Sequence, residues 1–440
     1  MIFREAMRSL KNSGSKAVFY VLTFFLTTAL MFAYFNMEYA VTSGKTEIYL
    51  NSVGLGDLAQ MIEKGNAGNL MLVFIVIMCA VDLFYCNSFY VKNKAQELGV
   101  RLICGATYIQ LAMYLLIQTI VMLAVAIPFG ILCGYGLIAL INTLLANAGE
   151  TVQVAVSGYA VAEFVSTILF ILLWTLMLNC SFAYKSGAVL LSGGNIAVMK
   201  DKSSYGLMGR KFFRLLVNAA SFIIAVLPLF MLFNGTGALA VGMAIGSWGL
   251  SRVLTEILPP FLTWLNRKKG TADTVRMTAV GFLRRDIMFS NAAVCLLLCD
   301  LLVVISMLFS RENTRLEYLL VLMTYICISI LQSMTVMFRL ETDLSSRGDE
   351  YVILSQVGTS EEDRKKITRG EILRFYGLVF LLVVIYGGMA MYALCRDSLA
   401  DVSQILLLSA AALVPVIIAG ILTLIYYRQV AAAGDVLKSR

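Results

Sequence analysis

The chain has 440 residues, of which 60% are hydrophobic and only 14% are charged, and its mean hydropathy is +0.83. This composition excludes a water-soluble globular protein, in which about 25% of residues carry charge. The net charge of +8 is spread over short polar segments between apolar runs, which favours contact with anionic lipid headgroups over binding of nucleic acid.

Continuous apolar stretches recur along the chain from Ala17 to Tyr426. Their length fits spanning helices of about 20 residues, and they do not alternate as the strands of a β-barrel would. We therefore expect an all-α polytopic membrane protein with about ten spans. The expected spans are 17–38, 69–90, 108–138, 159–183, 214–233, 237–262, 291–310, 317–338, 374–395 and 405–427.

Two amphipathic basic segments precede spans and are expected to lie along the membrane surface. The first, at residues 1–17, places Arg4, Arg8 and Lys11 on one side of a helix. The second precedes the seventh span and begins near residue 275.

The distribution of Lys and Arg predicts the orientation of the chain. If the N-terminus is cytoplasmic, most of the 35 basic residues lie in cytoplasmic segments, including the clusters at 210–214, 267–269 and 364–369. The basic residues then left outside are Lys45, Lys64, Arg311, Arg315 and Arg396. We expect a multi-pass protein of the bacterial cytoplasmic membrane with both termini in the cytoplasm.

An internal repeat relates the two halves of the chain. Glu97 precedes Gly105 by the same number of residues as Glu350 precedes Gly358, and a span follows each Gly. The repeat predicts two parallel four-helix units joined by a two-helix linker. The expected domains are 1–184 with spans 1 to 4, 185–265 with spans 5 and 6, and 266–440 with spans 7 to 10.

The stretch NSFYVKNKAQELGVRLICGAT, which begins at Asn87, resembles the signature of FtsX-like permeases. The residues that carry the resemblance are Ser88, Phe89, Lys92, Lys94, Glu97, Leu98, Gly99, Gly105, Ala106 and Thr107. The second copy keeps Arg347, Glu350, Gly358, Thr359 and Ser360 but has Val352 where the first has Gly99.

The ten-span layout is similar to the BceB-type branch of the MacB/BceB-type permeases, which is associated with resistance to antimicrobial peptides or bacteriocins. That branch carries a large extracellular domain between its seventh and eighth spans. Here only Arg311 to Leu316 occupies this position.

The resemblance implies that the two repeated segments are short cytoplasmic helices that dock on the two subunits of an ABC ATPase homodimer. The implied coupling residues are Lys94, Glu97, Leu98, Gly99, Gly105, Ala106, Arg347, Glu350, Gly358 and Thr359. ATP and Mg would be bound by the partner, because this chain has no phosphate-binding G-x-x-x-x-G-K-[ST] loop. Ordinary tight loops between helices are the alternative reading.

The residue types argue against a catalytic centre, a cofactor site or a metal site in the chain itself. Histidine, the commonest general base and metal ligand, is absent from the sequence. Glu361, Glu362 and Asp363 fit a solvated helix start better than catalysis. Cys295 and Cys299 share a helix face, where we expect packing rather than metal binding.

Ionisable residues within the expected spans are candidates for functional positions, because charge is costly in the membrane. They are Asp82, Glu163, Arg252, Glu256 and Asp300. Arg252 and Glu256 are four residues apart and are expected to form an ion pair, with a gating or substrate-path role as the alternative. Asp82 and Asp300 mark either helix contacts or a polar cavity.

Small residues in the third and ninth spans permit close helix packing or a hinge. They are Pro128, Gly130, Gly134, Gly387 and Gly388. Both readings are compatible with the sequence.

These features predict a permease subunit that uses the ATPase to export or expel an amphipathic peptide or lipid-like substrate. By resemblance, the substrate would be an antimicrobial peptide or bacteriocin. One alternative is transmission of force, without transport, to a sensor kinase or a cell-wall hydrolase. Another is an ion-coupled secondary transporter, whose parallel repeats would look the same.

Overall fold

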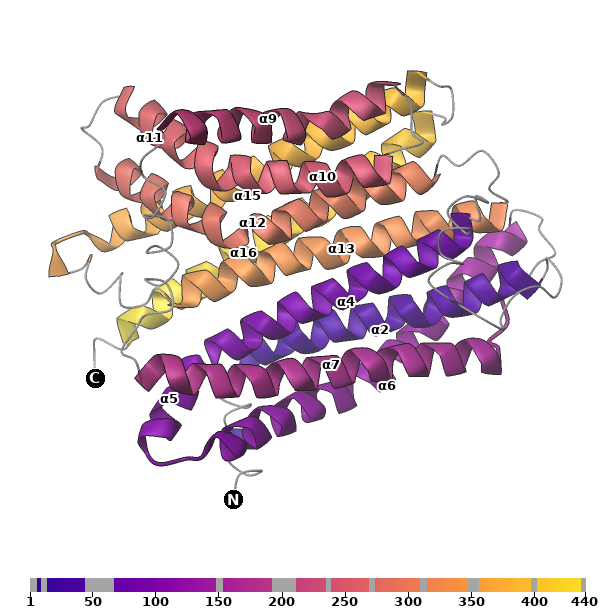
Figure 1. The fold of residues 1–440 in the computed structure, drawn as a ribbon, viewed down its shortest axis with the longest axis horizontal. Coiled ribbons are helices and arrows are strands. Elements are labelled where there is room, and N and C mark those ends of the chain that lie inside the picture. The colour runs from indigo at the N-terminus through magenta and orange to yellow at the C-terminus, as the bar shows by residue number, and fades with distance from the viewer. Residues whose placement is uncertain are drawn as a thin grey trace. The chain divides into compact units, whose positions relative to one another are not determined.

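The computed structural model describes residues 6–8, 14–43, 67–147, 153–191, 211–234, 239–268, 274–308, 315–346, 354, 356–396 and 402–436. Within these ranges the ordered elements are helices, and no strand occurs. Seven of the helices in these ranges are long and apolar enough to cross a membrane. The chain is an all-α polytopic membrane protein, as the composition predicted (Figure 1).

The helices fall into two compact units, which are described separately. The first unit comprises Met1–Met208 and Ser310–Cys327, and the second comprises Gly209–Phe309 and Ile328–Arg440. The first contains α2 (Gly14–Ser43), α4 (Ala67–Asn93), α5 (Ala95–Ile103), α6 (Tyr108–Asn147) and α7 (Gly158–Leu191). The second contains α9 (Lys211–Asn234), α10 (Leu239–Arg252), the π-helix η2 (Val253–Ile257), α11 (Leu258–Lys268), α12 (Thr274–Leu308), α15 (Glu361–Arg396) and α16 (Val402–Val436). The unit boundary falls within α13 (Arg315–Ser346).

A helix occupies each of the ten stretches expected to span the membrane. The second and fifth contain the shorter apolar helices Phe74–Ser88 and Val217–Met231, and the sixth is divided by η2. Ten spans therefore remain a prediction, and so do the domain limits at 184 and 265. The compact units differ in grouping from those domains, since α9 and α10 lie in the second unit.

Several helices are longer than the hydropathy predicted. The basic segment before the seventh span is continuous with that span in α12, and the acidic start of α15 precedes the expected span by about a dozen residues. Hydropathy detects only the part of a helix that lipid covers, so polar turns at its ends escape detection. Of the expected surface helix at residues 1–17, the structure describes residues 6–8, which are helical, and residues 14–17, which are the start of α2.

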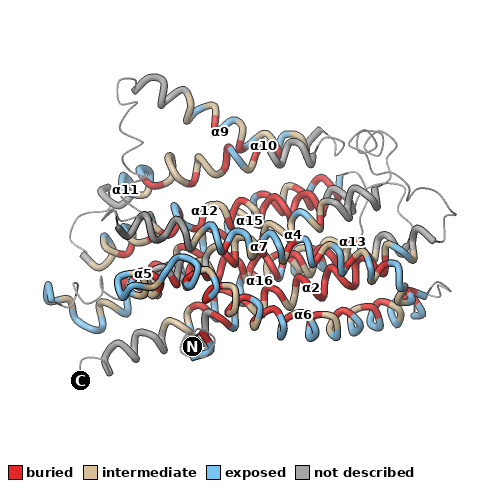
Figure 2. Tube along the Cα trace, turned by 60° about the horizontal axis from the view of Figure 1, so that its bottom comes forward, coloured by how far each residue is buried: buried red, intermediate tan, exposed pale blue. Residues whose placement is uncertain are grey.

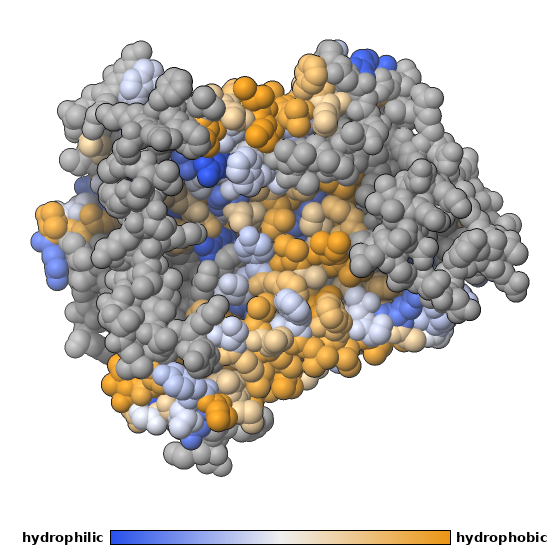
Figure 3. Space-filling model, in the orientation of Figure 1, coloured by the Kyte–Doolittle hydropathy of each residue, from blue (hydrophilic) through white to orange (hydrophobic). Residues whose placement is uncertain are grey.

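In the first unit α2 is the central helix, in contact with α4, α6 and α7. Gly130 and Gly134 of α6 face α2, where a Cβ at Gly130 would lie 2.6 Å from Thr28 Cβ and one at Gly134 would lie 2.8 Å from Phe32 Cδ1. The alternation of buried and exposed positions along α6 is visible in Figure 2. The outward faces of α6 and α7 are apolar (Figure 3), as lipid contact requires.

In the second unit α12 packs against α10 and α15, and α15 packs against α9 and α16. The α9–α10 pair is close, because a Cβ at Gly249 would lie 2.7 Å from Ala225 N. Tyr386 of α15 donates a hydrogen bond of 2.8 Å to Ala225 O, and Asn291 of α12 donates one of 2.7 Å to Ser251 Oγ of α10. These contacts attach the predicted linker pair to α12 and α15.

Candidate functional site

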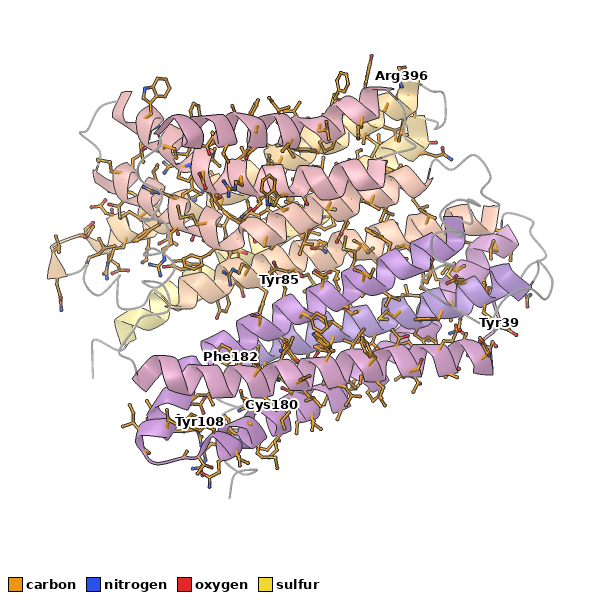
Figure 4. All side chains as sticks on the ribbon, in the orientation of Figure 1. Tyr39, Tyr85, Tyr108, Cys180, Phe182 and Arg396 are labelled. Carbon is orange, nitrogen blue, oxygen red and sulfur yellow. The ribbon has the colours of Figure 1, made fainter. Side chains whose placement is uncertain are left out.

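The first candidate coupling segment folds as the short helix α5, between α4 and α6. Its inward face is formed by Leu98 and Gly99, both buried, and Lys94 just before it is also buried. Its outward face is apolar, since Val100 is 58% exposed and Ile103 is 81% exposed. Figure 4 places Tyr108, at the start of α6, at the α5 end of the unit, and Tyr39 at the opposite end.

Gly105 ends α5 in a Schellman turn. Its φ of 92° lies in the left-handed region that glycine adopts without steric cost. Ala106 N donates to Arg101 O at 3.0 Å and Gly105 N donates to Leu102 O at 3.0 Å, the two bonds that define this motif. The predicted turn glycine and the small residue after it therefore have a structural role.

The next helix starts immediately with a reciprocal cap. Gln110 N donates to Thr107 Oγ1 at 3.4 Å, and Thr107 N donates to Gln110 Oε1 at 3.0 Å. This capping box satisfies two backbone donors at the start of α6 and fixes the angle at which the chain leaves the turn.

The second copy has the same turn. Gly358 has a φ of 94°. Thr359 N donates to Leu354 O, five residues earlier, at 3.1 Å, which matches the bond from Ala106 N to Arg101 O in the first turn. Ser360 caps α15 by accepting a bond of 3.1 Å from Asp363 N. Gly358 follows Gly105 by 253 residues, and the first residue of α15 follows the first residue of α6 by the same number. The remaining predicted residues of this copy, Arg347 and Glu350, lie outside the described residues.

Glu97 is held by charged and polar neighbours. Its carboxylate lies 2.9 Å from Lys94 Nζ and 3.4 Å from Arg101 Nη2, and it accepts a hydrogen bond from the Tyr114 hydroxyl of α6. The Arg101 guanidinium also lies over the Tyr114 ring, 4.2 Å from its centroid. These contacts fasten α5 to α6, so Glu97 contributes to the position of α5.

Sequence reasoning did not identify Arg101 and Tyr114 as members of this site. Arg101 follows Glu97 by one helical turn, a spacing that favours an ion pair and could have been recognised. Tyr114 could not, because its contact with Glu97 depends on the path of the turn between α5 and α6.

The predicted intramembrane charges occupy different environments. Asp82 of α4 is buried, and Glu163 lies in the second turn of α7, partly exposed. Asp300 of α12 is buried and accepts a hydrogen bond from Gln332 of α13. Arg252 Nη1 lies 3.6 Å from Glu256 Oε1, where the π-helix η2 interrupts the helical span. Two of these residues, Asp82 and Glu163, belong to the first unit, and the other three belong to the second.

The predicted hinge residues also differ from one another. Pro128 lies inside α6, two residues before Gly130, which together with Gly134 faces α2. A Cβ at Gly387 would lie 3.9 Å from Leu301 Cδ2, whereas one at Gly388 would have no neighbour within 4 Å. A hinge remains a prediction at these positions.

The described residues include no group of three or more Cys, Asp or Glu side chains arranged to hold a metal ion. Cys295 and Cys299 are free thiols, both buried on α12.

No family model matches the chain. The chain is 19% identical over 187 residues to the bacitracin export permease protein BceB of Halalkalibacterium halodurans. The match covers 42% of this chain and 27% of that protein, so the chain aligns with about a quarter of its relative. The chain is a multi-pass membrane protein that is similar, over part of its length, to an export permease.

Proposed function

We propose that the chain is the permease subunit of an ABC transporter. It couples ATP hydrolysis by a separate cytoplasmic ATPase dimer to the export or expulsion of an amphipathic substrate, an antimicrobial peptide or bacteriocin. The observation that carries the proposal is the pair of matching turns at Gly105 and Gly358, each of which leads directly into a long apolar helix. An ATPase dimer presents two equivalent surfaces, and two repeated turns in one chain supply one contact for each.

The proposed contact surface consists of apolar side chains at the two turns. Ile103 at the end of α5 and Val357 in the second turn are 81% and 80% exposed. In the first turn Ile109 extends this surface, with 77% exposure. Large apolar side chains outside the lipid-covered part of a helix are costly in water, and burial against a partner removes that cost.

The proposed orientation places both turns and both termini in the cytoplasm. It follows from the excess of Lys and Arg in the same loops. The similarity to a bacitracin export permease supports the peptide as substrate, and the apolar outward faces of α6 and α7 suit a substrate that reaches the protein through the membrane.

The proposal is tested by purification of the tagged full-length chain from its host membrane in mild detergent. Co-purified proteins are identified by mass spectrometry, and ATP hydrolysis by the purified material is measured. We expect an ABC ATPase in the wild-type sample and at least a tenfold reduction in its recovery with Ile103→Glu plus Val357→Glu.

Val402→Glu is the matched control, because Val402 at the start of α16 is 81% exposed and no turn of the repeat contains it. It should retain the ATPase. Stable wild-type protein without any ATPase would contradict the proposal and favour an ion-coupled secondary transporter, whereas a co-purified sensor kinase would extend it to signalling.

A further inference from the structure

A chain of buried hydrogen bonds connects the four long helices of the first unit. Tyr20 of α2 donates to Asn87 Oδ1 of α4 at 3.2 Å, and Asn87 Nδ2 donates to Asn179 Oδ1 of α7 at 2.7 Å. Asn179 Nδ2 then donates to Thr119 Oγ1 of α6 at 2.9 Å. Thr119 Oγ1 donates to Leu115 O of its own helix at 2.9 Å, which completes the chain.

All four side chains that link the helices are buried, and all are uncharged. Tyr20 lies at the start of the apolar part of α2, and Thr119 lies eleven residues after the start of α6. Asn87 and Asn179 lie near the ends of the apolar parts of α4 and α7. They therefore form one layer near the end of the unit that carries α5. Cys180, which follows Asn179, lies toward this end of α7 in Figure 4.

Two further contacts continue from this layer toward α5. Tyr90 of α4 donates to Gln118 Oε1 of α6 at 3.1 Å, and Gln118 Nε2 donates to Ala6 O at 3.2 Å. One turn earlier on α6, Tyr114 donates to Glu97 of α5. Thr119 and its neighbour Gln118 thus bind α7 and α4 from the same turn of α6, and Tyr114, one turn earlier, binds α5.

The membrane setting gives these bonds a specific role. Lipid is as apolar as the side chains it contacts, so the hydrophobic effect does not select which helix faces which, and interhelical hydrogen bonds help to fix the arrangement. Hydrogen bonds in series also polarise one another. A broken link leaves a buried amide or hydroxyl without its partner, which opposes separation of the helices.

We infer that Asn87, Asn179 and Thr119 are positioning residues that make α5 and the four long helices of the first unit move as one body. The functional role of this link rests on the proposed function, because α5 docked on an ATPase transmits motion only if the long helices move with it. The mechanical link itself is a property of this chain alone.

The test compares one substitution at two positions of the full-length chain in lipid nanodiscs. Thr119 and Thr175 are both buried, and each donates to a carbonyl one turn earlier in its own helix. Thr119 in addition accepts the bond from Asn179. Thr119→Val therefore removes a link between helices, and Thr175→Val is its matched control.

The measurement is amide hydrogen exchange of Ala95–Ile103 by mass spectrometry. We expect Thr119→Val to accelerate exchange in α5 by about threefold or more. Asn179→Leu, which removes two links, should accelerate it more strongly. Thr175→Val should leave exchange in α5 unchanged. Equal exchange of α5 in Thr119→Val and Thr175→Val would overturn the inference, and this comparison decides even if Asn179→Leu does not fold.

A second readout uses the complex with the co-purified ATPase. In wild type and Thr175→Val, vanadate trapping with ATP should change hydrogen exchange at the ends of α6 and α7 that lie away from α5. In Thr119→Val this change should be smaller by at least half, while ATP hydrolysis continues. An undiminished change in Thr119→Val would overturn the inference. Absence of any ATPase would contradict the proposed function and leave the exchange of α5 as a separate test of the link.

Discussion

At the scale of single residues, the turn glycines have a conformational requirement. Gly105 has a φ of 92°, and a Cβ at this position would meet no atom within 4 Å. The backbone alone therefore opposes substitution. Gly105→Ala should lower the free energy of unfolding by about 1 kcal/mol, measured from thermal unfolding in detergent.

Gly105→Asn should lower the free energy of unfolding by less, since asparagine adopts the left-handed region more readily than alanine. Equal stability of the wild type and the alanine variant would show that this backbone conformation is not required.

A second prediction at this scale concerns the glycines of α6. A Cβ at Gly134 would lie 2.8 Å from Phe32 Cδ1 and 3.1 Å from Ala29 O, whereas one at Gly136 would have no neighbour within 4 Å. Gly134→Ala should destabilise the protein by about 1–3 kcal/mol through displacement of α2. Gly136→Ala should be neutral or slightly stabilising by the same unfolding measurement, because alanine favours the helix. Similar effects at both positions would argue against close α2–α6 packing.

Part of the candidate site was predictable from the sequence at the residue scale. The spacing of Glu97 and Gly105 predicted a short segment followed by a turn, and both are present. The contact of Glu97 with α6 depends on which helices become neighbours. The same holds for the series of hydrogen bonds through Asn87 and Asn179. The only sequence signal for this series is the presence of Asn in apolar spans, a residue type that often joins membrane helices.

At the scale of elements, the start of α15 depends on its cap. Ser360 Oγ accepts the backbone N–H of Asp363, an otherwise unsatisfied donor in the first turn. Ser360→Ala should cost about 1 kcal/mol and accelerate hydrogen exchange in the first turn of α15. Ser409→Ala in α16, where the hydroxyl bonds only to Leu406 O of its own helix, is the control and should leave exchange in α15 unchanged. Unchanged exchange in both variants would mean that the cap does not determine the start of α15.

Existence of the helices was predictable, and their ends were less so. Continuous apolar runs gave each expected span, because only helices satisfy their backbone within lipid. The thirteen residues of α15 before the expected span at 374 include eight charged side chains, so hydropathy could not detect them as part of the same helix. The interruption by η2 also lacks a hydropathy signal, although Pro259 and Pro260 lie in the first turn of the following helix, α11.

At the scale of the whole molecule, the repeat is the feature that organises the proposed function. The two turns share a glycine in the left-handed region, a backbone hydrogen bond that spans five residues and a capped helix start. The sequence predicted the repeat from residue spacing, and the backbone of each turn now supplies independent support for it. Which residues fall into which compact unit could not be read from the sequence, because α9 and α10 are attached to α12 and α15 by hydrogen bonds between residues far apart in the chain, Tyr386 with Ala225 and Asn291 with Ser251.

The most direct test of the central claim is the mass of the intact complex. Native mass spectrometry of the tagged chain, released from detergent with its co-purified proteins, measures how many ATPase copies bind one permease chain. We predict two copies per chain in wild type and in Val402→Glu, and none in Ile103→Glu plus Val357→Glu. A wild-type mass equal to that of the chain alone would contradict the account.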